Sequence, residues 1–87
     1  MENRPIEMLS VCGADGTLRP VRFRYEDEAH ALETVQVSEV VSCKEVQYVG
    51  VEALIFLCRV RVAELERLLE LKYTVRTHRW VLFRVVF

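Results

Sequence analysis

Residues whose side chains could carry out acid–base or nucleophilic chemistry are few in this chain, and they form no known catalytic pattern. His30 follows the acidic run Glu26-Asp27-Glu28, and His78 lies in a short predicted turn, so both are typical of turn residues. A cysteine nucleophile needs a base within hydrogen-bond reach, whereas the alternating pattern assigns Cys43 and Cys58 to the core. The sequence therefore predicts no catalytic residue, and we expect that the protein is not an enzyme.

Patterns that bind metals are equally absent from the sequence. Its three cysteines form no C-x-x-C pair and have no histidine beside them, which argues against a zinc site. The acidic run before His30 lacks the glycine and the spacing of a calcium loop. The odd number of cysteines and the lack of a signal-peptide pattern favour a reducing compartment. We therefore expect a cytoplasmic protein without a metal or other cofactor.

Length and charge narrow the classes of partner. The 87 residues suffice for one domain, residues 1–87, and 52% of them are hydrophobic, which is high for a chain with so little interior. A net charge of -1, from 12 basic and 13 acidic residues, gives no general attraction to nucleic acid or to an anionic membrane. No apolar run approaches the length of about 20 residues that a membrane-spanning helix needs. Some apolar surface must therefore stay exposed or meet a partner, and self-association is the simplest explanation.

Alternation of apolar and polar residues with a period of two, broken by turn residues, predicts strands along the whole chain. The predicted strands are Ile6–Cys12, Leu18–Tyr25, Thr34–Cys43, Val51–Val62, a fifth from Leu68, and a sixth after a loop at Thr77-His78-Arg79. Residues Ala63–Arg67 fit either a loop or one helical turn, and the broken alternation at Glu39-Val40-Val41 indicates a β-bulge. Six consecutive antiparallel strands form a meander, which buries its apolar face by closing into a small barrel; a sandwich is the alternative.

Turn chemistry and the matching of apolar residues predict how two hairpins pair. Asp-Gly is typical of a two-residue hairpin turn, so a turn at Asp15-Gly16 sets the first register. The predicted pairs are Glu7 with Arg24, Ile6 with Tyr25, Met8 with Phe23 and Ser10 with Val21. A loop at Gly50-Val51 places Cys43 opposite Cys58, and the cytoplasmic setting predicts that both thiols stay reduced.

The last hairpin is predicted to turn its tryptophan outward. Pairing Tyr73 with Phe83 puts Trp80 and its neighbour Leu82 on the face opposite to the core. The resulting exposed apolar patch comprises Ile55, Leu57, Trp80 and Leu82, with Arg76 near the indole and Val86 beside them. Patches of this kind mark interaction sites. The sequence therefore predicts a homodimer, or a protein partner, held by this patch; local cover by the N-terminal segment or by residues 63–67 is the alternative.

Four arginines, Arg22, Arg24, Arg59 and Arg61, are predicted to share a second outward face. Small barrels bind single-stranded nucleic acid with a basic groove and stacking aromatic rings, but the pattern places no stacking ring on this face. Glu7 and Glu70 are expected opposite Arg24 and Arg61, as in cross-strand ion pairs. Single-strand nucleic-acid binding is therefore the alternative function, ranked below protein interaction.

The stretch LELKYTVRTHRWVLFRVV, which carries Tyr73, Trp80 and Leu82, contains a Tyr-bearing strand, a short turn and a W-x-L strand. It resembles the closing hairpin of small uncharacterised bacterial all-β domains, some of which are encoded beside translesion DNA polymerases. The resemblance covers roughly 20 of the 87 residues. It implies a small bacterial β-barrel with a DNA-related context, and it assigns no active residue.

Overall fold

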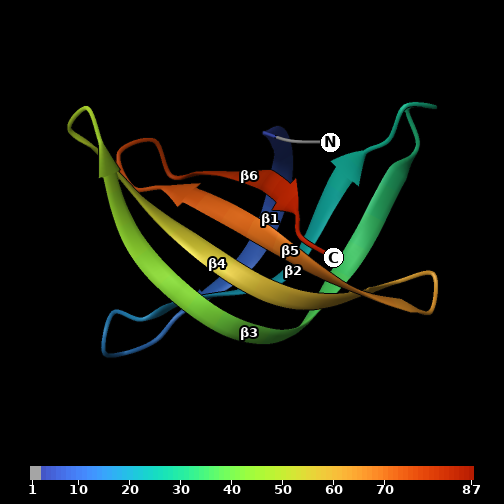
Figure 1. Ribbon diagram of the computed structural model, residues 1–87, viewed down its shortest axis with the longest axis horizontal. Helices are drawn as coiled ribbons and strands as arrows, with labels where there is room; N and C mark the ends of the chain where they lie inside the picture. Colours follow the sequence, from blue (N-terminus) through green and yellow to red (C-terminus); the bar gives the residue numbers. More distant parts are fainter. Residues whose placement is uncertain (1–2) are drawn as a thin grey trace.

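The computed structural model describes residues 3–87, and in these residues it contains six strands and no helix. The strands are β1 (Arg4–Cys12), β2 (Leu18–Glu26), β3 (Leu32–Tyr48), β4 (Val51–Val62), β5 (Leu65–Thr74) and β6 (Arg79–Val85). Each strand pairs antiparallel with the next, and β6 returns to pair with β1, so the sheet closes into a barrel (Figure 1). The predicted fold class is confirmed, and the barrel rather than the sandwich is correct.

The β1–β2 hairpin has the predicted register in its half away from the turn, and a different register next to the turn. Met8 lies opposite Phe23, as predicted, but Ser10 lies opposite Pro20 and not opposite Val21. The loop is one residue longer than the predicted two-residue turn. The Gly13 amide donates to the Thr17 carbonyl at 2.8 Å, which closes the loop around three residues, and Gly16 adopts a φ of 88° within it. A bulge on β2 then takes up the extra residue and restores the predicted pairing.

The long strand β3 changes partner along its length. It pairs with β2 up to Gln36 and with β4 from Gln36 to Tyr48. The register against β4 shifts twice, between Val37 and Glu39 and between Val40 and Ser42, which confirms the predicted bulge. Because bulges bend a strand and increase its twist, β3 sweeps around the barrel as one curved strand (Figure 1).

The turn between β3 and β4 overturns the predicted cysteine pair. Val49 and Gly50 both have positive φ, 51° and 78°, which is the geometry of a two-residue hairpin turn. The turn is therefore centred one residue earlier than predicted, and the bulge near Val40 shifts the register again. Cys43 consequently lies opposite Phe56, whereas Cys58 lies opposite Val40. All three cysteines are free thiols.

The predicted register of the β5–β6 hairpin is also wrong. Its loop runs from Val75 to His78, and the His78 amide donates to the Thr74 carbonyl at 2.9 Å. Tyr73 therefore lies opposite Trp80, and not opposite Phe83. Trp80 and Leu82 face inward, whereas Phe83 lies outside beneath the Lys72 ammonium, 5.3 Å from its ring centre.

The segment Ala63–Arg67 contains a short loop of two residues, followed by the first residues of β5, and it has no helical turn. Ala63 and Glu64 form a two-residue turn with φ of 49° and 68°, and β5 begins at Leu65. The hairpin thereby brings inward-facing residues from β4 and β5 together at one end of the barrel. The buried core inside comprises Phe23, Val35, Phe56, Cys58, Val60, Leu69, Leu71, Trp80 and Leu82.

Candidate functional site

The exposed apolar patch predicted from the sequence does not exist as such. Trp80, Leu82 and Ile55 are only 8%, 3% and 6% exposed. The Trp80 ring packs against Tyr73 and Phe56 at centroid distances of 5.0 and 5.4 Å, because the indole fills the barrel interior. Ile55 does face outward, and its register neighbours are Lys44 on β3 and Lys72 on β5. Leu57 is half-buried, and Arg76 is exposed in the β5–β6 loop.

The four arginines do come together on the outer face, where β2, β3 and β4 run side by side. Arg22 and Arg61 lie on either side of Gln36 in one row across the sheet. Arg24 lies opposite Glu7, as predicted, and its Nε donates to the carboxylate at 2.8 Å. The predicted contact of Glu70 with Arg61 is wrong, because Glu70 accepts from Arg84, on the neighbouring strand β6, at 2.5 Å.

Acidic partners occupy much of this basic face. Arg59 donates to Glu39 at 3.1 Å and to Glu66 at 3.0 Å, and these hydrogen bonds raise the pKa of the Arg59 guanidinium. Within residues 3–87, Arg22 and Arg61 form no ion pair; the register neighbours of Arg22 are Leu9 and Gln36, and those of Arg61 are Gln36 and Glu66. The row therefore lacks the aromatic platform on which single-stranded bases stack.

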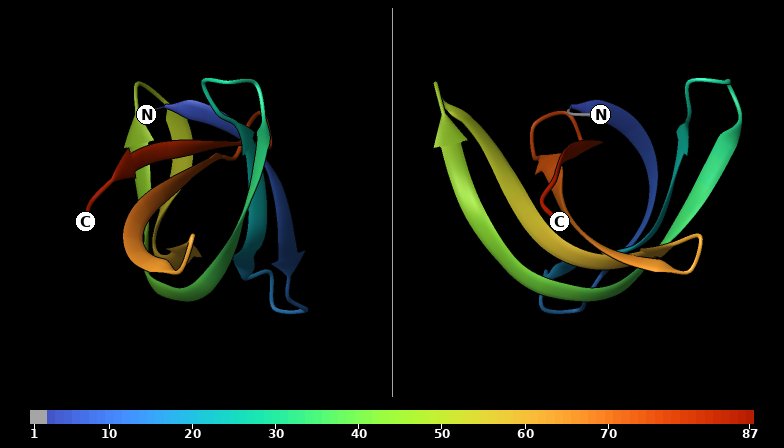
Figure 2. Two further views of the ribbon diagram at one scale, coloured as in Figure 1. Left: turned by 90° about the vertical axis from the view of Figure 1, so that its right-hand side faces the viewer. Right: turned by 45° about the vertical axis from the view of Figure 1, so that its right-hand side comes forward.

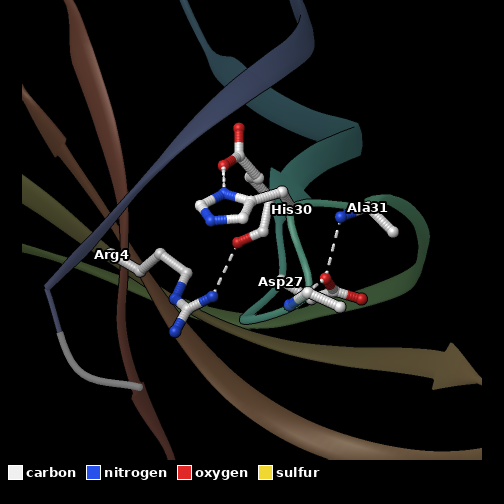
Figure 3. A network of polar contacts seen from close by, with 6 residues as sticks. Arg4, Asp27, His30 and Ala31 are labelled. Carbon is white, nitrogen blue, oxygen red and sulfur yellow. Dashed lines mark hydrogen bonds and ion pairs between the residues drawn. The ribbon is translucent and has the colours of Figure 1, made fainter.

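Both histidines make contacts within or next to the loops in which they lie. His30 contacts Glu26 at 2.5 Å, and Asp27 accepts from the Ala31 amide at 2.9 Å, which holds the β2–β3 loop (Figure 3). Arg4 donates to the Glu26 carbonyl at 2.7 Å and so ties the start of β1 to the same loop. His78 lies 2.8 Å from the hydroxyl of Tyr73. No group of three or more metal-ligating side chains occurs in the described part of the chain.

Two thiols have a raised pKa, but only Cys58 is buried; Cys43, predicted as a core residue, is exposed, and so is Cys12. Burial raises the pKa of Cys58 to about 12, and the neighbouring Cys43 adds to the shift. Desolvation raises the pKa of Cys43 as well, with a contribution from the carboxylate of Glu45. Because the thiolate is the reactive form, neither residue is suited to be a nucleophile at neutral pH.

One end of the barrel opens into an apolar hollow of about 220 Å³, here called the mouth hollow. It is lined by Phe23, Tyr25, Val35, Val62, Ala63, Leu65, Arg67, Leu69, Leu82 and Val85. Leu65 stands at the rim with 63% of its surface exposed, and Arg67 is the one charged residue of the lining. Sequence reasoning missed this site because it treated residues 63–67 as a connection; the exposed Leu65 in an alternating β pattern was the available signal.

The fold defines this protein as a small six-stranded antiparallel β-barrel. No protein-family model, curated protein or solved structure matches the chain. The likeness of the closing hairpin to small bacterial β domains therefore stays a prediction. Across residues 3–87 there is no helix with the length and apolarity needed to cross a bilayer.

Proposed function

We propose that this protein is a non-enzymatic interaction module that self-associates through the mouth hollow. The observation that carries the proposal is a protruding apolar side chain beside an apolar cavity on the same rim. Leu65 is largely exposed, and the hollow next to it is lined almost entirely by aliphatic and aromatic side chains. A surface with a knob and a hole side by side is self-complementary under a twofold axis, the commonest symmetry of homo-oligomers.

The charges on the rim support this arrangement. Glu64 lies in the turn at the rim and Arg67 follows on β5, and within residues 3–87 neither takes part in an ion pair. A twofold axis that brings Leu65 of each copy into the hollow of the other also brings opposite charges to the edge of the contact. Complementary rim charges add orientation and association rate more than affinity.

The energetic scale suits a weak dimer. Full burial of a leucine side chain contributes about 1.5–3 kcal/mol, and a twofold contact buries two of them together with the apolar rims. Ordering and the loss of translational freedom take back a large part of this gain. We therefore expect association at roughly millimolar concentration, which corresponds to about 4 kcal/mol of net binding free energy. The homodimer predicted from the sequence is retained, but at a different surface.

Substitution of Leu65 tests the proposal. We expect sedimentation velocity at roughly millimolar concentration to give a dimer for the parent protein and a folded monomer for Leu65→Glu, because a charge on the rim cannot enter the apolar hollow. Leu9→Glu is the matched control, since Leu9 is also half exposed but lies on β1 away from the hollow. A monomeric parent, or a Leu65→Glu variant that remains dimeric, contradicts the proposal.

Single-strand nucleic-acid binding has weaker support. The row of Arg22 and Arg61 around Gln36 is the one observation in its favour. Two of the four arginines are engaged by carboxylates, and the net charge of -1 gives no general attraction to phosphate. The apolar hollow has no role in such a function, so protein interaction accounts for more of the molecule.

A further inference from the structure

The barrel is open on one side, between the start of β2 and the second half of β3. The two strands pair only through Arg22–Glu26 and Leu32–Gln36. Among the described residues, positions 18–20 of β2 have register partners on β1 alone, and positions 37–48 of β3 have them on β4 alone, apart from the bulge residues Val21, Ser38 and Val41. The β3–β4 hairpin reaches out from the body of the barrel, with β3 along its free side (Figure 2). Two strand edges thus flank an opening without hydrogen bonding to each other.

Side-chain exposure shows that the inner surface of this opening is uncovered. Cys43 lies opposite the buried Phe56 and Glu45 lies opposite Leu54, so both occupy inward-facing positions, yet both are exposed. An adjoining cleft of about 500 Å³ runs between the β1–β2 loop and β3. Its wall is largely apolar: Leu18, Val40, Leu54 and Phe56 line it, together with Gly16, Thr17, Arg19, Cys43 and Glu45. An inward-facing residue that stays exposed marks a place where a covering strand is missing.

The free edge of β3 indicates what kind of molecule could bind in the opening. A free strand edge presents unpaired N–H and C=O groups, and another extended backbone is the group that satisfies them. The opening has the β1–β2 loop on its far side, so an added strand would lie between this loop and β3. The β3 edge of a second copy is less suitable, because that strand carries β4 along its other edge as a two-stranded ribbon.

Charge defines the partner further. Two charged residues line the cleft, Glu45 from β3 and Arg19 from the start of β2, and within residues 3–87 neither takes part in an ion pair. We propose that the cleft binds an extended peptide segment of a partner protein as an added strand on β3, with alternate apolar side chains turned inward and a basic side chain against Glu45. This site lies on a different surface from the mouth hollow and does not depend on self-association.

Synthetic peptides test the inference directly. The probe is a labelled peptide of alternating valine and threonine with a central lysine, compared with the same peptide carrying glutamate and with a version N-methylated on alternate amides. We expect the lysine peptide to bind, the glutamate peptide to bind about fivefold more weakly, and the N-methylated peptide to lose binding because it cannot pair with β3. Amide chemical shifts of the protein should change at positions 37–48 and 18–21.

Variants of the protein test the role of Glu45 and separate this site from the mouth hollow. Glu45→Gln should remove the preference for lysine over glutamate, whereas Glu33→Gln, an exposed carboxylate on the first half of β3, should preserve it. Leu65→Glu should bind the lysine peptide as the parent does, which separates this site from the proposed dimer contact. Absence of binding, shifts confined to the mouth hollow, or equal binding of the N-methylated peptide overturns the inference. Shifts at positions 37–48 that depend on protein concentration without peptide also overturn it, because a second copy then occupies the edge.

Discussion

Single residues on β6 decide which side chains fill the barrel. Trp80 is enclosed by Tyr73 and Phe56, while Phe83 points outward and is only half-buried against Lys72. The sequence predicted Phe83 as a core residue and Trp80 as a surface residue, and the structure reverses the two. A charged residue at position 80 is therefore expected to unfold the domain, rather than to yield the folded monomer that an exposed patch would allow.

A pair of alanine substitutions measures this reversal. We expect Trp80→Ala to lower the free energy of unfolding by about 3–5 kcal/mol, and Phe83→Ala by about 1 kcal/mol, because only the indole leaves a cavity inside the barrel. Urea denaturation followed by circular dichroism gives both values. A loss for Phe83→Ala as large as that for Trp80→Ala would restore the register first predicted.

Because the thiol of Cys58 is buried, we expect the free energy of unfolding to fall at alkaline pH. Its pKa is raised from 9.0 to about 12 in the folded protein, so the folded state holds the proton more tightly than the unfolded state. The stabilisation is complete below pH 9 and is lost as the pH rises toward 12. We expect the free energy of unfolding to fall over this range, and to fall less in Cys58→Ala. An identical fall in parent and variant, measured by denaturation at a series of pH values, would contradict the assignment.

At the scale of elements, β3 gives the barrel both its curvature and its opening. Its 17 residues pair first with β2 and then with β4, and the two register shifts lie just beyond the change of partner. A bulge at this place lets one strand serve two directions of the sheet. The same bend carries the second half of β3 away from β2, which leaves its edge without a strand.

The β3–β4 turn stores backbone strain that a substitution should relieve. Val49 is a β-branched residue at a φ of 51° and is 85% exposed, so no packing offsets its conformation. Asn-Gly is the preferred pair for this turn. We expect Val49→Asn to raise the free energy of unfolding by about 1 kcal/mol, and Gly50→Ala, at a φ of 78°, to lower it. Thermal unfolding decides the point; a Val49→Asn variant less stable than the parent would show that the valine has a packing role.

At the scale of the whole molecule, closure of the barrel is uneven, and the two proposed binding surfaces lie where it is open. Within residues 3–87, the register pairs between β1 and β6 are confined to Arg4–Ile6, with one further backbone hydrogen bond from the Asn3 amide to the Phe83 carbonyl, and β2 and β3 separate beyond Gln36. Six strands enclose an interior that nine buried side chains fill, so a ligand has access at an end or at a gap in the wall. The mouth hollow occupies one end, and the cleft beside β3 occupies the gap.

The sequence by itself determined the period-two strands, their antiparallel order, the bulge in β3 and the pairing of Met8 with Phe23. These features depend on local turn chemistry and on strands with one clearly apolar face. Only the tertiary structure decided which face of β6 points inward, because Trp80 and Leu82 on one side and Val81 and Phe83 on the other are all apolar. The length of the preceding loop and the volume of the barrel interior settle that choice, and neither quantity is encoded in the alternation of a single strand.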